Sequence, residues 1–151
     1  MLTQVKFARI KPNAKLPYRA TTGSGGADLF ACVDDLSGIV IQPHETVLIG
    51  TGLKAEFANG YVALVYARSG LASKKHMAPA NKVGVIDADY RGEWMVPLHN
   101  HSNAPQIIEN GERIAQVIFH EVEFPEFIEV DESELSDTAR GEGGIGSTGT
   151  K

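Results

Sequence analysis

The sequence predicts an all-β protein: an antiparallel β-sandwich of jelly-roll type, followed by a glycine-rich C-terminal tail. Short runs of apolar and β-branched residues recur along the chain, and turn signals separate them at the spacing typical of a sandwich or barrel. Glycine and proline supply 16 and 7 of the 151 residues, which indicates many turns. A sustained helical period is missing from the pattern, so we expect very little helix.

The strands follow one another in the order of these apolar runs. The first contains Val5, Phe7 and Ile10, and the run YVALVY at 61–66 is apolar on both faces, as is typical of a strand in the middle of a sandwich. One short helix is expected over 69–75, with Ser69 near its N-cap. The other predicted strands cover 27–33, 38–41, 46–49, 53–57, 82–86, 93–98, 106–108 and 114–119, with turns at 42–45 and 59–60.

The composition changes after Val130. Residues 131–140 are acidic and polar, and residues 141–151 include five glycines, which cannot support a packed element. We therefore expect a jelly-roll domain over 1–130 and a flexible tail over 131–151. Composition alone favours a disordered end. The alternative is a strap that orders over an anionic ligand, with Arg140 as its charge.

Charge and composition exclude several classes of protein. Fourteen Lys and Arg against nineteen Asp and Glu give a net charge of −5, so non-specific nucleic-acid binding is not expected. Cys32 is the single cysteine and is expected to be a core thiol, which leaves no disulfide framework and no cysteine zinc site. The chain contains no apolar run of membrane-spanning length and no apolar signal-peptide core, so we expect a cytoplasmic protein.

Two sequence patterns match ligand-binding motifs but are not interpreted as binding sites. Gly141, Gly143 and Gly146 form G-x-G-x-x-G, but this pattern binds dinucleotides only between a strand and a helix. His99 and His101 are spaced like a metal pair on one strand face. With no third ligand at a supportive spacing, they are interpreted as surface histidines.

Five short stretches combine small residues with isolated polar or charged ones. In the first, GGADL at 25–29, Asp28 either caps a turn or faces a hydrated cation. In the second, Arg68, Ser69 and Gly70 follow the strand at 61–66. They either cap the helix or donate hydrogen bonds to an anion.

The third stretch, residues 81–92, places an amide, two carboxylates and a phenol on a turn that we expect to be a hairpin between two strands. Asp87 at the mouth of this turn is a candidate general base toward water. In the fourth stretch Gln116 lies within an apolar strand and needs partners for both ends of its amide. The fifth stretch is Arg140 with the glycine-rich tail.

Taken in this order, the five stretches resemble the motifs of the homotrimeric dUTPases (dUTP pyrophosphatases), from about Lys6 to Gly149. The motifs are GGADL, RSGLA, N-x-x-G-x-I-D-x-D-Y-x-G, GERIAQ and RGEGG-x-GSTG, each weak alone and very specific together. The resemblance implies a distorted jelly roll and a homotrimer with three active sites at its subunit junctions. It also implies hydrolysis of dUTP to dUMP and pyrophosphate, which keeps uracil out of DNA and supplies dUMP for thymidylate synthesis.

The resemblance further implies a role for each matching residue. Asp87 is the base that activates water for attack on the α-phosphate, and Asp28 acts on Mg²⁺ through the metal's waters. Tyr90 packs under the deoxyribose and leaves no room for a 2′-hydroxyl. The implied phosphate-binding residues are Arg68, Ser69, Gly70, Gln116 and Arg140, and the nucleoside-contacting ones are Asn81, Gly84, Val85, Ile86 and Met95.

The chain departs from the family pattern at two positions. Ile145 stands where the tail usually carries a Phe that stacks on the uracil, so we expect weaker closure of the tail over the base. Ala67 stands where a Pro is frequent, which loosens the turn before Arg68.

Two other functions compete with this one. A dCTP deaminase has the same architecture but needs a Glu-centred site for the pyrimidine amine, whereas this turn carries Asp87 and Tyr90. A non-catalytic jelly-roll binding protein would keep the fold alone, and the joint presence of Asp28, Asp87 and Arg140 argues against it.

Overall fold

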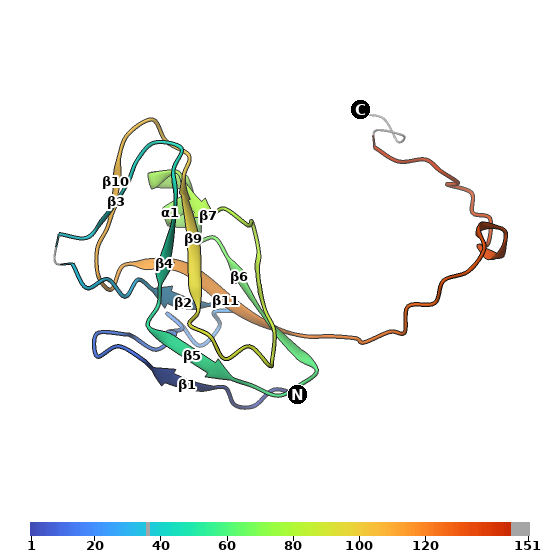
Figure 1. Cartoon of the computed structure of the whole chain (residues 1–151), viewed down its shortest axis with the longest axis horizontal. Coiled ribbons are helices and arrows are strands. Elements are labelled where there is room, and N and C mark those ends of the chain that lie inside the picture. Colours follow the sequence, from blue (N-terminus) through green and yellow to red (C-terminus); the bar gives the residue numbers. More distant parts are fainter. Residues whose placement is uncertain (36, 146–151) are drawn as a thin grey trace.

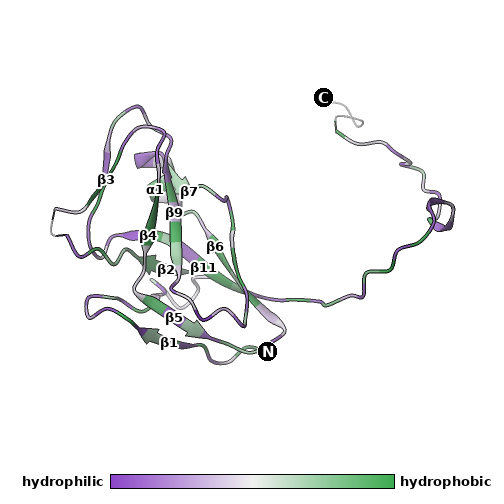
Figure 2. Cartoon of the chain, viewed as in Figure 1, coloured by the Kyte–Doolittle hydropathy of each residue, from purple (hydrophilic) through white to green (hydrophobic). Residues whose placement is uncertain are grey.

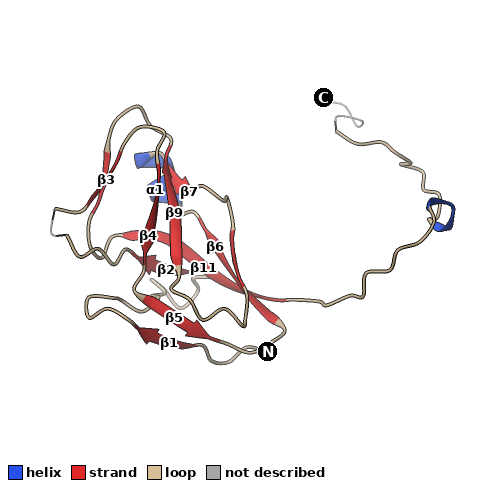
Figure 3. Cartoon of the chain, in the orientation of Figure 1, coloured by secondary structure: helices blue, strands red, loops and turns tan. Residues whose placement is uncertain are grey.

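Strands supply most of the regular structure in the computed structural model, which describes residues 1–35 and 37–145 (Figures 1 and 3). Helical segments among these residues are confined to α1 (Ser69–Lys75) and the 3₁₀ turn η1 (Glu132–Glu134). The strands are β1 (Lys6–Arg9), β2 (Ala27–Phe30), β3 (Ile39–Ile41), β4 (Thr46–Gly50), β5 (Leu53–Glu56), β6 (Tyr61–Tyr66), β7 (Met77–Pro79), β8 (Gly84–Ile86), β9 (Met95–Asn100), β10 (Gln106–Ile108) and β11 (Arg113–Glu121).

The strands pair antiparallel, and most pairs join segments far apart in the sequence. One sheet has the order β2-β11-β6-β8 and another has β4-β9-β7, while β1-β5 and β10-β3 form two-stranded sheets. These crossovers between distant strands confirm the predicted jelly-roll architecture. β11 lies between β2 and β6, and its register sets Gln116 opposite both Asp28 and Tyr66.

The core consists of apolar side chains from strands of all four sheets, together with Leu71 of α1 and with Phe57 and Trp94, which lie outside the strands. Trp94 is buried beside Phe7, whose ring meets it edge-on with centroids 5.2 Å apart. Cys32 is buried as predicted, and burial raises the pKa of its thiol. Figure 2 shows apolar colour on the strands of the body. The largest fully buried side chains are Trp94, Leu29, Ile41, Ile49, Leu53, Met77, Leu98, Ile108, Ile114, Val96, Val117 and Asn100.

The region around the third stretch differs from the prediction. Its flanking strands do not form a hairpin, because β8 pairs with β6 whereas β9 pairs with β4 and β7. β8 begins at Gly84 rather than at Lys82, whose backbone is left-handed with φ 65° and cannot continue a strand. β7 was not predicted, because three residues ending in proline carry no alternation.

The predicted helix is present and begins at Ser69. The residue at its N-cap is Arg68, in extended conformation, and its side chain makes no capping hydrogen bond. Ser69 is therefore the first helical residue rather than the cap. Leu71 is the buried residue of this helix and anchors it to the core.

The strand β6 is an inner strand of its sheet, as its sequence suggested, but its two faces differ. Ala63 and Val65 are buried in the core, whereas the opposite face is half-buried. On that face Val62 and Leu64 line an apolar groove of about 760 Å³, which Phe124 also borders.

Beyond β11 the chain runs away from the body as an extended segment (Figure 1). Nearly every described residue after Val122 is exposed, including Phe127 and Ile128. At the start of η1 the N–H of Asp131 donates to Oε1 of Glu134 at 3.1 Å, and the N–H of Glu134 donates to the main-chain oxygen of Asp131 at 2.9 Å. The predicted boundary after 130 and the flexibility of the tail remain predictions.

No helix among residues 1–35 and 37–145 has the length and apolar character needed to cross a membrane.

Candidate active site

The first stretch of the sequence meets the second and the fourth in one pocket of about 270 Å³. β2 supplies Asp28, the end of β6 leads to Arg68, and β11 supplies Gln116. The register of β11 against its two neighbours puts these three elements side by side. The remaining lining residues are Tyr18, Ala20, Ser24, Gly25, Gly26 and Ser69.

The carboxylate of Asp28 lies between two arginines. Oδ1 accepts from Nε of Arg68 at 2.6 Å, and Oδ2 accepts from Nη2 of Arg68 at 3.4 Å and from Nη1 of Arg113 at 3.2 Å. The side chain of Asp28 is 12% exposed, so its charge is partly desolvated and needs these partners. Asp28 and Arg68 line the pocket and balance each other, and Arg113 beside them makes the three-residue cluster net positive, which suits a polyanion.

The side chain of Gln116 is held in this pocket by a close approach to Gly26. Its Nε2 donates to the carbonyl oxygen of Ala67 at 2.9 Å. A Cβ atom on Gly26 would lie 2.6 Å from Oε1 of Gln116, so only glycine leaves room for the amide. Gly26 lines the pocket and Arg113 contacts Asp28 from beside it, and the sequence alone assigns no role to either residue.

Arg68, Ser69 and Gly70 lie where the strand passes into the helix. The side chain of Arg68 is turned onto Asp28, whereas Ser69 and Gly70 are exposed in the first turn of α1. The backbone N–H groups of a first helical turn have no intrahelical acceptor, so they are available to an anion or to water.

A second pocket, of about 330 Å³, collects most of the residues that the resemblance assigned to the nucleoside. Val85, Ile86, Asp87, Tyr90 and Met95 all line it. The peptide N–H of Tyr90 donates to the carbonyl oxygen of Asp87 at 3.1 Å, so a tight turn carries both side chains. Three further lining residues, Leu48, Glu93 and Trp94, were not identified from the sequence.

Asn81 and Gly84 stand beside this pocket rather than in its wall. Gly84 pairs with Val65 at the start of β8, and a Cβ atom there would lie 3.3 Å from Nδ2 of Asn81. The side chain of Asn81 is thus placed at the entrance to β8.

The tail residues lie outside both pockets. Nε of Arg140 donates to the carbonyl oxygen of Gly143 at 2.7 Å, within a turn of the exposed tail. Ile145 is fully exposed. One chain therefore presents the predicted site residues at three separate places: the Asp28 pocket, the Asp87 pocket and the tail.

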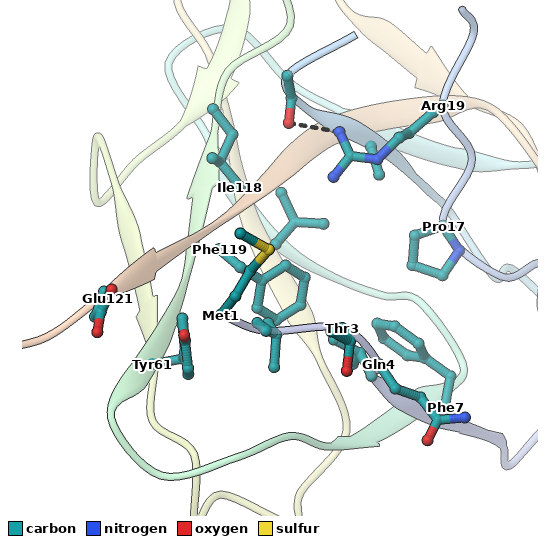
Figure 4. Close-up of a pocket in the computed structure, with 15 residues that line it drawn as sticks. Met1, Thr3, Gln4, Phe7, Pro17, Arg19, Tyr61, Ile118, Phe119 and Glu121 are labelled. Carbon is teal, nitrogen blue, oxygen red and sulfur yellow. Dashed lines mark hydrogen bonds between the residues drawn. The ribbon is translucent and has the colours of Figure 1, made fainter. Parts of the chain in front are cut away.

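Two further grooves are larger than either pocket. The apolar groove beside β6 adjoins the second pocket, because Val85 and Asp87 line both. The other groove, of about 770 Å³, has both polar and apolar walls and lies between the N-terminal segment and β11 (Figure 4). Figure 4 also shows Arg19, whose guanidinium donates to the carbonyl oxygens of Ser24 and Gly25 at 2.5 and 2.6 Å. These bonds close the loop at the rim of the Asp28 pocket.

The histidine pair lies at the far end of β9. The rings of His99 and His101 meet edge-on with centroids 4.3 Å apart, and Nδ1 of His99 is bonded to Oγ1 of Thr46 at 2.8 Å. Burial, and secondarily the nearby imidazole of His99, lower the pKa of His101. Within the described ranges no three His, Cys, Asp or Glu side chains gather as a metal site.

Comparisons with known proteins agree in pointing to one family. A profile described as dUTPase matches residues 12–149. A protein of Hydrogenobaculum sp. named deoxyuridine 5'-triphosphate nucleotidohydrolase is 49% identical over 143 residues, which cover 95% of this chain and 96% of that protein. A protein of the same name from Desulfitobacterium hafniense is 46% identical over 149 residues, 97% of this chain and 96% of the relative.

The fold comparison gives the same result. A variant of the Staphylococcus bacteriophage 80alpha dUTPase, solved with dUpNHpp, superposes with a TM-score of 0.83 at 29% identity. The match covers 97% of this chain and 98% of the phage chain.

Proposed function

This chain belongs to the dUTPase family and is an enzyme, and from that premise we propose that it hydrolyses dUTP to dUMP and pyrophosphate. The observation that carries the proposal is the division of polar groups between two pockets. The pocket around Asp28, Arg68 and Gln116, with the guanidinium of Arg113 beside it, has an excess of positive charge that suits the triphosphate. A pocket with Asp87 and Tyr90 on one tight turn suits the nucleoside and the attacking water.

Asp87 acts as the general base. Its carboxylate accepts a proton from water while the water oxygen attacks the α-phosphorus and the bond to the pyrophosphate oxygen breaks. Negative charge builds up on the departing pyrophosphate. Arg68, Gln116 and the tail's Arg140 supply hydrogen bonds to it, of which the two from arginine are charge-assisted.

The backbone of β8 reads the base. β8 stands at the end of its sheet and pairs with β6 along one edge only, within the part of the chain that the structure describes. The backbone N–H and C=O groups on its other edge are available to the donor and acceptor edge of uracil. Cytosine exchanges donor and acceptor at positions 3 and 4 and would leave buried polar groups without partners, which is a strong basis for discrimination.

Tyr90 reads the sugar. Its ring lines the pocket beside Met95, and its hydroxyl donates to the carbonyl oxygen of Glu93 at 3.2 Å, which fixes the ring's position. A ring held under the deoxyribose leaves no space for a ribose 2′-hydroxyl.

The donor set fits Mg²⁺ bound chiefly by the substrate. Asp28 offers a single carboxylate whose two oxygens already accept from arginines, and no three-carboxylate cage exists among the described residues. Mg²⁺ commonly keeps several waters and binds through one or two carboxylates and substrate phosphates. Asp28 would hold it through water, and the metal would neutralise phosphate charge when bound.

A homotrimer is part of the proposal, since the predicted site residues of a single chain lie at separate places. Arg140 lies on a tail that leads away from the body, and the apolar groove beside β6 leaves Val62 and Leu64 half-covered. A neighbouring copy that covered such a face could also bring its tail to the pockets. The cytoplasmic location remains a prediction.

Product analysis tests the proposed function against its alternatives. The enzyme incubated with dUTP and Mg²⁺ should give dUMP and pyrophosphate in equal amounts. Asp87→Asn should lower kcat by roughly 10²–10⁴-fold while the non-hydrolysable analogue dUpNHpp still binds. Ammonia released from dCTP would indicate the deaminase. Wild-type protein that binds the analogue but turns nothing over would indicate a binding protein.

A further inference from the structure

The turn that carries Asp87 and Tyr90 is attached to the body at its C-terminal end. Because the expected hairpin is absent, no partner strand holds residues 87–94 in place. The main chain of Trp94 instead bonds to the β4–β5 turn: its N–H donates to Leu53 at 2.8 Å, and its carbonyl oxygen accepts from the N–H of Thr51 at 3.1 Å and from the hydroxyl at 2.7 Å.

The side chain of Glu93 makes a second attachment to the same turn. Its Oε1 accepts from the N–H of Gly52 at 2.8 Å, and Gly52 is buried with a left-handed φ of 67°. A Cβ atom on Gly50 would lie 2.5 Å from the same oxygen. The carboxylate is therefore seated in a space that exists only because residue 50 is glycine.

The main chain of Glu93 meets Tyr90. The phenol hydroxyl donates to the carbonyl oxygen of Glu93 at 3.2 Å. The ring lies so close to the α-carbon of Gly92 that a Cβ atom there would overlap the phenol oxygen. The position of the ring thus depends on the backbone at 92–93, and the Glu93 side chain fixes that backbone to Gly52.

We propose that Glu93 is a positioning residue for sugar discrimination: it holds the backbone carbonyl that orients Tyr90 and so keeps the ring where a 2′-hydroxyl would have to fit. The inference rests on the proposed function, because Tyr90 is assigned to the sugar there. The side chain of Glu93 lines the pocket from the side of the β4–β5 turn and reaches Tyr90 only through the main chain.

The readout is the ratio of kcat/KM for dUTP to kcat/KM for UTP, measured well below the lowest melting temperature of the set. Glu93→Ala removes the anchor and should lower this ratio by about tenfold, since small displacements of a positioning group cost one to two orders of magnitude. Glu93→Gln keeps an oxygen that accepts from Gly52 and should restore the ratio to within about twofold of wild type.

Glu45→Ala is the matched control. The carboxylate of Glu45 also accepts from a backbone N–H, that of Gln42 at 2.7 Å, in a turn that lines neither pocket. This variant should keep the wild-type ratio. Should Glu93→Ala fail to fold, Gly50→Ala provides the same test, because its methyl group displaces the carboxylate from its seat without removing it.

The outcomes separate this inference from the proposed function. A wild-type enzyme that does not hydrolyse dUTP overturns the proposed function and the inference with it. An active wild type together with an unchanged ratio in Glu93→Ala overturns the inference alone. Equal losses in Glu93→Gln and Glu93→Ala would also overturn it, because the hydrogen bond to Gly52 would then not be the anchor.

Discussion

Replacing Asp28 by Asn removes the one negative charge from the pocket that we assign to the triphosphate. The amide oxygen can still accept from Nε of Arg68, but the amide nitrogen is a donor and then faces Arg113. The net charge of residue 28, Arg68 and Arg113 together changes from +1 to +2, because the two guanidinium groups lose the carboxylate between them.

The cost of this change in stability can be bracketed from the exposure of the partners. Exposed ion pairs contribute about 0–1 kcal/mol, and breaking a buried pair costs about 3–5 kcal/mol. The side chains of Asp28, Arg68 and Arg113 are 12%, 28% and 44% exposed, so the site lies between these limits. We expect a loss of about 2 kcal/mol, or a fall in Tm of about 4–8 °C for a chain of this length.

Ligand binding should change in the opposite direction. Without Mg²⁺, the added positive charge should strengthen binding of dUpNHpp to Asp28→Asn. Mg²⁺ should increase the affinity of wild-type protein for dUpNHpp, and this increase should be about tenfold smaller in Asp28→Asn. Such a loss is typical when a group that orients metal-bound water is removed. Thermal melts at fixed protein concentration and calorimetric titrations with and without Mg²⁺ measure both effects.

Asp34→Asn is the control for this prediction. Asp34 pairs with Lys11 at 2.7 Å, but the two side chains are 72% and 36% exposed, so its loss should cost less than about 1 kcal/mol. An unchanged Tm in Asp28→Asn, or an unchanged benefit from Mg²⁺, would refute the reasoning about this pocket.

Four further expectations concern the sugar, the sharing of the site, the tail and pH. Tyr90→Ala should narrow the preference for dUTP over UTP in kcat/KM, and an unchanged ratio would place sugar discrimination elsewhere. The variants Asp87→Asn and Arg140→Ala should each be inactive alone. Co-refolding the two should restore activity, because some subunit junctions then combine an intact Asp87 from one chain with an intact Arg140 from another. Mixed trimers without activity would contradict shared sites. Ile145→Phe should tighten binding of dUpNHpp, since an aromatic ring stacked on a base contributes about 1–3 kcal/mol. Equal affinity would show that residue 145 does not reach the base. His101 has a lowered pKa in the folded state, so the unfolded chain binds the proton more readily. Stability should fall as pH drops below about 6.5, and it should fall less in His101→Gln. Parallel Tm–pH curves for the two proteins would contradict this.

The fold was largely predictable because alternation and turn signals are local properties. The strands around Ala63 and Val65 are clear from apolar residues alone. The pairing of β8 was not predictable, because the choice between β6 and β9 as its partner is made by long-range packing. The left-handed residue Lys82, which shortens β8, carries no signal comparable to that of glycine.

The site was predictable to the extent that its residues belong to recognisable patterns. Asp28 and Gln116 were identified from separate motifs, but only the register of β11 brings them together. Glu93 carries no signal in a single sequence, since its partner is the backbone of a distant turn. Arg113 was visible within GERIAQ, yet its ion pair with Asp28 depends on the same register.

The central claim is that this chain is a hydrolase selective for dUTP. The most direct test compares pyrophosphate release from dUTP, UTP, dCTP and dTTP under the same conditions with Mg²⁺. We predict that kcat/KM for dUTP exceeds every other value by several orders of magnitude, as expected of a site that leaves the polar groups of the wrong substrate unpaired. Comparable rates with the four nucleotides, or release of orthophosphate in place of pyrophosphate, would contradict the claim.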